Sequence, residues 1–282
     1  MICQWNEFIK LLPPWLQEPI NKLGKDSLTE LRLRVGLPPR LDLHSRSLNL
    51  DRLVKQDDIE YCINAASRYS PWATGSAANG YITTAGGHRI GICGEAIIIN
   101  GACTGFRNIT SLCMRVARDF PDLAKELCFL NGSVLIIGPP GCGKTTLLRD
   151  LIRQRSCRCT GSIAVLDERS EIFPSAHNAM CFDIGPNTDV MNNCPKASGI
   201  DMLIRNMGPR AIAVDEITAA RDCSALLQAS WCGIEILATA HAYDKRDLYR
   251  RLVYRPIIER NIFQQLIILH HDKTWHHERM EA

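Results

Sequence analysis

Four short runs of apolar residues divide the later part of the sequence, and each is typical of a buried β-strand. They cover residues 134–137, 163–166, 211–214 and 234–239. Helical spacing of apolar side chains lies between several of them, over residues 145–155 and 219–230, and a further helix is expected over residues 123–130. Strands that are apolar throughout and alternate with helices indicate a parallel sheet covered on both faces. Residues 121–282 are therefore predicted to form an α/β domain.

The first part of the chain has a different pattern. Residues 28–43 alternate apolar and basic side chains, as a strand does, up to Gly36 and the prolines that follow it. Residues 57–70 carry apolar side chains at helical spacing. From Gly80 onward, closely spaced glycines indicate short strands joined by hairpins. We expect a small α+β domain over residues 1–120.

The composition is that of a globular protein and identifies no partner. Of the 282 residues, 46% are hydrophobic and 22% are charged, which excludes a chain that is disordered throughout. The formal net charge of +3 gives no electrostatic reason to expect nucleic acid. No stretch is as long as the roughly 18 apolar residues that a membrane-spanning helix needs, so none is expected.

The thirteen cysteines form no C-x-x-C pair, and the first ten residues lack the apolar run of a secretory signal. Free thiols in a reducing cytoplasm are therefore expected, and no zinc site. The predicted location is cytoplasmic, with attachment to a membrane surface left open.

The clearest motif is GPPGCGKT at residues 138–145, which fulfils G-x-x-x-x-G-K-[ST] at every required position. Its glycines let the backbone curl so that N–H groups face phosphate oxygens, and the helix that follows adds its positive end. Lys144 is expected to reach the β- and γ-phosphates, and Thr145 to offer its hydroxyl to Mg²⁺. The sequence thus predicts ATP binding with Mg²⁺. The residues expected to contact the nucleotide are Gly138, Pro139, Pro140, Gly141, Cys142, Gly143, Lys144, Thr145, Thr146 and His241.

Cys142 lies inside this loop. We interpret it as a small residue that leaves its backbone N–H free, with an oxidation-sensitive thiol as the alternative.

Acidic residues follow the strand at 211–214. Asp215 is expected to hold Mg²⁺ through water, and Glu216, one residue later, to act as the general base that polarises the attacking water.

A second strand, at 163–166, ends in the same way with Asp167 and Glu168. Acids at this strand end are expected beside the phosphate loop, so both compete with Glu216 for the role of general base. The fourth strand leads to Thr239 and His241, which could sense the γ-phosphate or couple it to a neighbouring subunit.

The order of these motifs is phosphate loop, LDERSEI, CPKASGIDMLIRNMGPRAIAVDEI and ATAHAYD. It resembles the stage III sporulation protein AA family, a branch of the secretion-ATPase group of RecA-like P-loop enzymes. The segments ELRLRVGLPPRL, YITTAGGHRIGICGEAI and FRNITSLCMRVARD in the first part are similar to that family as well. The resemblance covers most of residues 10–270 and implies a RecA-like fold for the later domain.

The resemblance also implies an ATPase of endospore-forming bacteria, made in the mother cell. It would form a hexameric ring, with nucleotide between subunits, at the cytoplasmic face of the membrane around the forespore. There it would energise a secretion-like complex of membrane-embedded sporulation channel proteins. Related secretion ATPases often place the catalytic acid in the second acidic box, here Asp167 and Glu168, so the choice of general base stays open.

Four arginines fall in the family-like segments of the first domain. In a ring, one of them could neutralise the γ-phosphate of a neighbouring subunit, or each could simply pair with a local acid. They are Arg89, Arg107, Arg115 and Arg118.

Two other functions remain open. A RecA-like nucleic-acid motor is supported by a basic run with interleaved tyrosines at residues 243–255, although an ordinary charged helix is the simpler interpretation. A scaffold that binds ATP as an assembly signal, with little turnover, is the other alternative. The histidine-rich segment from residue 270 onward is expected to be a solvated end, with metal binding by its two histidine pairs, at residues 270–271 and 276–277, as the alternative.

Overall fold

The computed structural model describes residues 1–67, 80–127, 129–158, 161–176 and 179–280. The chain packs into two compact units. The first comprises Met1–Asp119 and Pro174–Phe182, and the second Phe120–Phe173 and Asp183–Ala282. The sequence pattern assigns residues 174–182 to the later domain, whereas in the structure they pack with the first unit.

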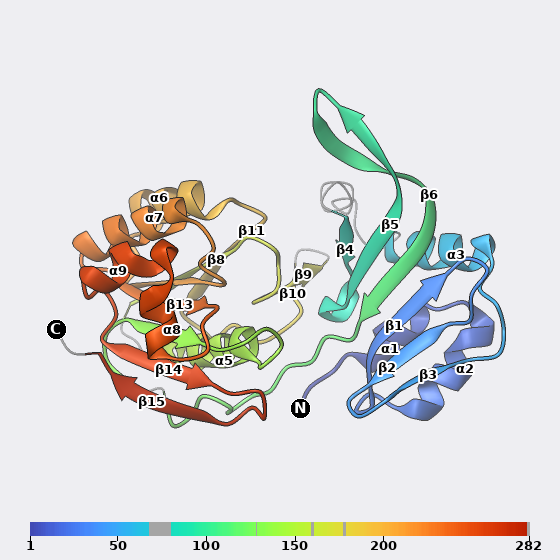
Figure 1. Ribbon diagram of the computed structural model, residues 1–282, viewed down its shortest axis with the longest axis horizontal. Coiled ribbons are helices and arrows are strands. Elements are labelled where there is room, and N and C mark those ends of the chain that lie inside the picture. The colour runs from blue at the N-terminus through green and yellow to red at the C-terminus, as the bar shows by residue number, and fades with distance from the viewer. Residues whose placement is uncertain (68–79, 128, 159–160, 177–178, 281–282) are drawn as a thin grey trace. The chain divides into compact units, whose positions relative to one another are not determined.

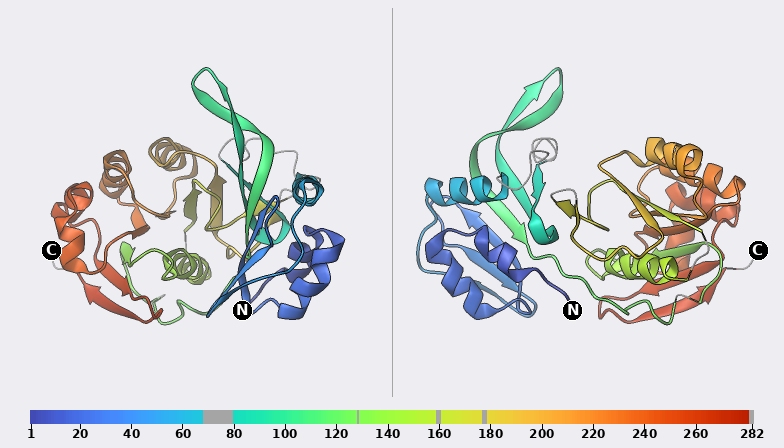
Figure 2. Two further views of the ribbon diagram at one scale, coloured as in Figure 1. Left: turned by 45° about the vertical axis from the view of Figure 1, so that its right-hand side comes forward. Right: turned by 180° about the vertical axis from the view of Figure 1, so that it is seen from behind.

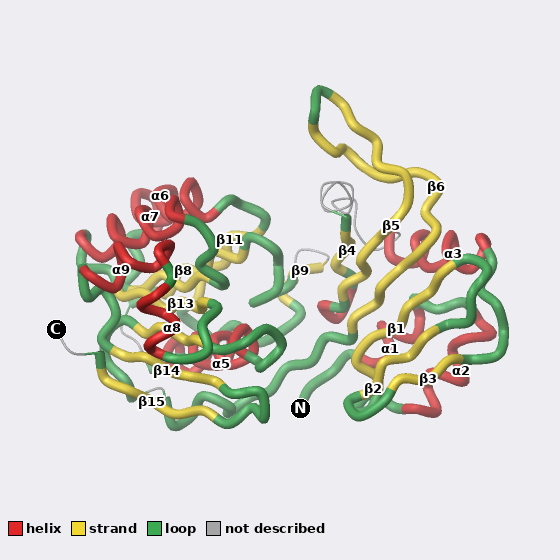
Figure 3. Tube along the Cα trace, viewed as in Figure 1, coloured by secondary structure: helices red, strands yellow, loops and turns green. Residues whose placement is uncertain are grey.

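The first unit contains an antiparallel sheet with the strand order β3-β2-β1-β6-β5-β4 (Figures 1 and 3). A separate short hairpin, β9 with β10, belongs to the same unit. The elements are α1 (Trp5–Lys10), α2 (Pro14–Leu23), β1 (Leu28–Arg34), β2 (Arg40–Leu43), β3 (Ser47–Asn49), α3 (Gln56–Ser67), β4 (Tyr81–Thr83), the 3-10 turn η1 (Ala85–Gly87), β5 (Arg89–Ile99), β6 (Ala102–Arg115), β9 (Ser175–Ala176) and β10 (Ala179–Met180). The strand expected over residues 28–43 is thus a hairpin of β1 and β2, reversed after Gly36, whose φ is 79°.

Alternation of side chains along β1 builds the core of this unit. Leu31 and Leu33 are fully buried, and they share one apolar cluster with Phe8 of α1 and Leu16 of α2. Successive strand residues point to opposite faces, so a strand with one buried side shows this period of two.

His88 joins three segments of the first unit. Its Nδ1 accepts the backbone N–H of Ala117 at 3.1 Å, so Nε2 carries the proton and donates it to the carbonyl of Gln4 at 3.0 Å. The ring is fully buried and makes an edge contact with Phe8. Burial lowers the pKa of His88 to about 4, because a charged imidazole would lose its hydration.

The second unit contains a sheet with the order β11-β8-β12-β13-β7-β14-β15, in which each neighbouring pair is parallel except β14 with β15. Its elements are β7 (Val134–Ile137), α5 (Lys144–Ser156), β8 (Ile163–Asp167), β11 (Thr188–Asn192), α6 (Lys196–Met207), β12 (Ala211–Val214), α7 (Ala220–Trp231), β13 (Glu235–Ala240), α8 (Lys245–Arg250), the 3-10 turn η2 (Leu252–Tyr254), α9 (Arg255–Glu259), β14 (Gln265–Leu269) and β15 (Trp275–Arg279). Within the described residues, no helix is long and apolar enough to cross a membrane.

Helices cover both faces of this sheet, with α6, α7 and α9 on one side and α5 on the other (Figures 1 and 2). Leu135 and Ile137 of β7 join the cluster beneath α6, α7 and α9, while Val134 and Ile136 are fully buried toward the opposite face. A strand covered on both sides is apolar at every position. The α/β class with a largely parallel sheet is confirmed.

The helix expected over residues 123–130 is wrong. The described part of this segment forms successive turns, with bonds from Lys125 N–H to the carbonyl of Asp122 and from Leu127 N–H to that of Ala124. The buried carboxylate of Asp150 accepts the backbone N–H groups of Asp122 and Ala124, at 3.3 and 2.6 Å. The Asp150 side chain of α5 therefore accepts these two backbone N–H groups. In a helix, the N–H groups of the first turn have no acceptor within the helix itself.

The histidine-rich segment is exposed at all four histidines, as expected of a solvated end, but it is also part of the sheet. Trp275–Arg279 forms β15, which pairs antiparallel with β14 and makes the edge of the sheet. His277 of this strand contacts the amide oxygen of Gln265 through Nε2, at 2.7 Å. Pairing with a buried strand therefore orders most of the histidine-rich segment.

We predict that His88 makes the first unit sensitive to acid. The folded pKa of about 4 lies below the ordinary 6.5, so the unfolded chain binds the proton more readily between these values. The stabilisation is present above pH 6.5 and is lost as the pH falls toward 4, by up to roughly 3 kcal/mol. Urea unfolding of wild type and His88→Gln across this pH range isolates the effect as their difference. A difference that does not change with pH would contradict the prediction.

Candidate functional site

The loop between β7 and α5 requires glycine at several positions. Gly141 and Gly143 have φ values of 75° and 106°, in the left-handed region that favours glycine. A Cβ on Gly138 would lie 2.7 Å from both the Sγ of Cys142 and the carbonyl oxygen of Leu269. Among the described residues, apart from the chain neighbours of each glycine, no atom lies within 4 Å of a Cβ placed on Gly141 or Gly143, so open space borders the loop there. The loop delivers the chain directly to the first turn of α5, where backbone N–H groups favour an anion.

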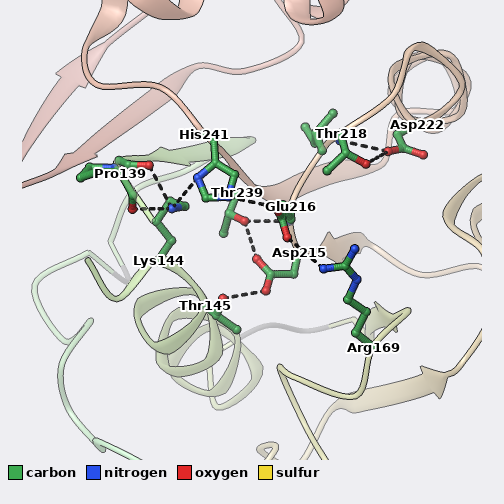
Figure 4. Close-up of polar contacts among 12 residues, drawn as sticks. Pro139, Lys144, Thr145, Arg169, Asp215, Glu216, Thr218, Asp222, Thr239 and His241 are labelled. Atoms are coloured by element: carbon green, nitrogen blue, oxygen red, sulfur yellow. Dashed lines mark hydrogen bonds and ion pairs between the residues drawn. The ribbon is translucent and has the colours of Figure 1, made fainter. Parts of the chain in front are cut away.

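Lys144 begins α5 and is buried. Its ammonium donates to the carbonyls of Gly138 and Pro139 at 2.9 and 2.8 Å, and lies 3.1 Å from Nδ1 of His241 (Figure 4). Burial lowers the pKa of Lys144, because charge in a dry environment loses hydration. The cation is therefore held by neutral acceptors that an anionic phosphate can replace with a stronger, charge-assisted bond.

Asp215, directly after β12, connects two further elements. One carboxylate oxygen accepts the Thr145 hydroxyl of α5 at 2.6 Å, and the other accepts the hydroxyl of Thr239 in β13. Thr239, fully buried, in turn accepts the backbone N–H of Glu216 at 2.8 Å. The expected pair of Thr145 and Asp215 is thus brought together by a direct hydrogen bond.

Glu216 has a left-handed backbone conformation, and its carboxylate lies near His241 and Arg169. Its φ of 50° is left-handed, which costs a non-glycine residue about 1 kcal/mol and is maintained here by the bond to Thr239. The carboxylate lies 2.9 Å from Nε2 of His241 and 3.7 Å from the guanidinium of Arg169. Since the ammonium of Lys144 can only donate, Nδ1 of His241 accepts and Nε2–H donates to Glu216. A neutral imidazole therefore links Lys144 to Glu216.

These side chains line one cavity of about 380 Å³. A volume of this size is within the range of small-ligand sites. The lining residues are Pro140, Gly141, Gly143, Lys144, Thr145, Thr146, Glu171, Asp215, Glu216, Thr239 and His241. Thr239 and His241, expected at the end of the fourth strand, both line the cavity, whereas Glu171 was not among the expected site residues. Cys142, by contrast, is only 2% exposed and packs toward Gly138 inside the loop.

The structure does not bring Asp167 and Glu168 into this cavity. The strand order sets β12 and β13 between β8 and β7, and neither acid is among the residues that line the cavity with the phosphate loop. The side chain of Glu168 instead pairs with Lys196, which is buried at the start of α6.

The Asp167 carboxylate turns into the protein. It is 1% exposed and accepts the backbone N–H groups of Glu171, Ile172 and Phe173 at 2.8, 2.9 and 2.8 Å. Burial raises the pKa of Asp167 to about 7, although these amides favour its ionised form. The bonds fix the backbone on which Glu171 reaches the cavity.

The four arginines considered in the first domain, and two of the basic run, have partners within their own units. Arg89 lies over the ring of Tyr81, Arg107 pairs with Glu95, Arg115 with Glu30, and Arg118 donates to the carbonyls of Lys25 and Leu28. In the basic run, Arg251 pairs with Asp247 and Arg255 with Glu259.

Comparison with known proteins gives the family. A family model described as sporulation stage III, protein AA, matches residues 15–278. The chain belongs to the stage III sporulation protein AA family. It is 33% identical to the stage III sporulation protein AA of Bacillus subtilis (strain 168) over 277 residues, which cover 94% of this chain and 90% of that protein.

Solved structures give the fold. The ATPase DotB of Legionella pneumophila matches with a TM-score of 0.56 at 18% identity, covering 95% of this chain and 80% of that one. The pilus retraction motor PilT, solved with bound ADP, matches with a TM-score of 0.61 at 17% identity, covering 89% and 76%. Together with the strand order, these matches confirm the RecA-like P-loop fold expected for this family member.

We predict that Asp167 is a structural residue. Asp167→Ala would leave three buried N–H donors without their acceptor and lower the free energy of unfolding by about 2–4 kcal/mol. Glu259→Ala, which removes an exposed carboxylate from the same unit, should change it by less than about 1 kcal/mol. Urea unfolding at pH 8 measures both, and equal losses would refute the assignment.

Proposed function

We propose that this chain is an ATP-hydrolysing motor. The observation that carries the proposal is the convergence of Lys144, Thr145, Asp215 and Glu216 on one cavity, beside a loop whose conformation requires glycine. These are the groups that phosphoryl transfer needs: a cation for the phosphates, oxygens for a metal and a carboxylate for water. Similarity to the ATPase DotB and to the pilus retraction motor PilT with bound ADP supports the same function.

Different residues would bind the phosphates and the metal ion. Lys144 would exchange its carbonyl partners for oxygens of the β- and γ-phosphates, and the N-terminus of α5 would add its positive end. The hydroxyl of Thr145 and the carboxylate of Asp215 form an oxygen-only pair suited to Mg²⁺, directly and through water. When bound, Mg²⁺ neutralises charge that develops on the phosphates.

Glu216 is the proposed general base. It lines the cavity, whereas Asp167 is engaged by backbone amides and Glu168 by Lys196. The contact from His241 orients the Glu216 carboxylate, and that imidazole also touches Lys144, the group expected on the γ-phosphate. His241 therefore couples the proposed phosphate contact to the proposed base.

The cellular role that fits family membership is energising a secretion-like channel complex during endospore formation. We propose that the chain works there as a homo-oligomeric ring, a hexamer as the family resemblance implies, with nucleotide between subunits. It would act at the cytoplasmic, mother-cell side of the membrane around the forespore, bound to membrane-embedded sporulation channel proteins. The 33% identity to a stage III sporulation protein over nearly the whole chain supports this role.

The nucleic-acid motor is not favoured. Its supporting run includes Tyr254, which is 4% exposed and donates its hydroxyl to the carbonyl of Ile217, so that ring cannot stack on a base. Arg251 and Arg255 are paired with acids of their own segment. The nucleotide-gated scaffold differs from the motor only in turnover, and measured hydrolysis separates the two.

Lys144→Ala is expected to abolish phosphate release and to weaken ATP binding by about tenfold or more, because the buried cation is lost. Lys22→Ala is the control, since that side chain is 73% exposed and pairs with Glu18 of the same helix. Phosphate release and nucleotide titration measure the two effects. Unchanged hydrolysis in Lys144→Ala would end the proposal.

Glu216→Gln is expected to lower kcat by about 10²–10⁴ while ATP affinity is kept, because the amide cannot accept the proton of the attacking water. Glu168→Gln should lower kcat by less than about tenfold, since its carboxylate points to Lys196. Steady-state phosphate release with each variant tests the choice. A larger loss in Glu168→Gln would reassign the base.

Ring formation predicts that ATP raises the molar mass of the purified chain in solution. Light scattering with ATP, with ADP and without nucleotide measures the mass, and phosphate release is followed in the same samples. A multimer that turns over ATP supports the motor, and a multimer without turnover supports the scaffold. A persistent monomer without hydrolysis would contradict both.

A further inference from the structure

Part of the long β5–β6 hairpin extends beyond the sheet of the first unit (Figures 1 and 2). β4 pairs with β5 only over residues 89–91, and β1 pairs with β6 only over residues 111–115. Beyond these positions the hairpin is a ribbon of two strands, and no other described strand pairs with either of its edges. We call residues 97–105 the ribbon tip, because the next residue, Phe106, still packs against the apolar cluster of the first unit. A ribbon of only two strands is marginally stable in water by itself, so a surface that covered the tip would stabilise it.

The ribbon tip exposes three consecutive isoleucines. Ile97, Ile98 and Ile99 are 39%, 59% and 55% exposed. Their partners across the ribbon are Gly105, Cys103 and Ala102, which are too small to cover an isoleucine side chain. A cluster of large apolar groups that its own chain leaves uncovered marks an interaction surface.

Both strands of the ribbon change from charged to apolar residues at paired positions. Glu95 and Arg107 face each other across the ribbon and form an ion pair at 2.9 Å. Between them the tip contains no charged residue. The boundary between charged and apolar residues therefore runs across the ribbon axis, as it does for an element that meets a planar apolar phase end-on.

Both faces of the tip are apolar. The register shifts between Ile97 and Ile98, but Ile98 and Ile99 pair regularly beyond it and therefore lie on opposite faces, because successive residues of a strand alternate. A groove on a partner protein covers one face of a ribbon, whereas lipid surrounds it. Two of the three polar side chains of the tip have local acceptors: Thr104 donates to the carbonyl of Ile97 at 3.2 Å, and the Cys103 thiol to that of Gly105 at 3.5 Å, while Asn100 stands at the turn. These bonds reduce the cost of leaving water.

We propose that the ribbon tip inserts into the interfacial region of a phospholipid bilayer. From Ile97 to the turn at Asn100 the strand advances by about 10 Å, which matches the depth of roughly 5–10 Å reached by interfacial elements. Insertion stays shallow because the ribbon edges carry unpaired backbone groups that need water. The proposal is independent of ATP hydrolysis, since no residue of the tip lines the nucleotide cavity.

The test is flotation of the full chain with vesicles of phosphatidylcholine alone. Wild type should float, and the triple variant Ile97→Ser, Ile98→Ser, Ile99→Ser should lose about tenfold or more of its vesicle partitioning. Leu53→Ser is the matched control, because Leu53 is 53% exposed in the same unit but outside the ribbon, and it should float like wild type. An unchanged thermal midpoint shows that the triple variant is folded.

Salt and oligomeric state separate apolar insertion from electrostatic adsorption and from self-association. An apolar insertion is insensitive to ionic strength, so binding that requires anionic lipid and is released by salt would overturn the proposal. Equal flotation of wild type and the triple variant would overturn it as well. A fall in molar mass of the triple variant without vesicles, with no change in flotation, would identify a second copy of the chain as the occupant instead.

Discussion

The carboxylate of Asp215 is the contact on which the geometry of the nucleotide cavity depends. Because β13 lies between β7 and β12, the strand bearing Asp215 is two strand spacings, about 10 Å, from the one that leads into the phosphate loop. Thr145 spans this distance from α5, and Thr239 of the intervening strand supplies the second hydrogen bond. Thr239 then fixes the left-handed backbone of Glu216. One carboxylate therefore positions the loop helix, the intervening strand and the proposed base together.

The parts of the fold that follow from local pattern could be predicted from the sequence. Strands β7 and β12 begin and end where the apolar runs do, because burial on both faces excludes polar residues at every position. Residues 123–130 could not be predicted in this way, since their turns depend on the Asp150 carboxylate, which lies more than twenty positions later in the chain. β15 likewise depends on a neighbour, β14, that supplies its hydrogen bonds.

The same distinction between local pattern and tertiary contact applies to the residues of the candidate site. The loop motif and its spacing indicate Lys144 and Thr145, and a buried strand ending in acids indicates Asp215. Strand order is not encoded in any local pattern, so two similar acidic strand ends look equivalent in the sequence. In the structure one end borders the cavity and the other belongs to a strand further from the phosphate loop, with Asp167 turned inward. Glu171 lines the cavity on a segment whose backbone N–H groups are held by the inward carboxylate of Asp167. This is a tertiary effect, and residue spacing alone does not contain it.

Connectivity adds a constraint that links the cavity to the first unit. The chain passes between the two units after Asp119, after Phe173 and after Phe182, so any movement of one unit relative to the other must be accommodated at three points rather than one. The second of these crossings starts from backbone that Asp167 holds by three hydrogen bonds, and it lies only three residues beyond Glu171 in the cavity wall. The cavity wall at Glu171 is therefore joined to the first unit by a short covalent segment whose backbone Asp167 holds on the side of the second unit.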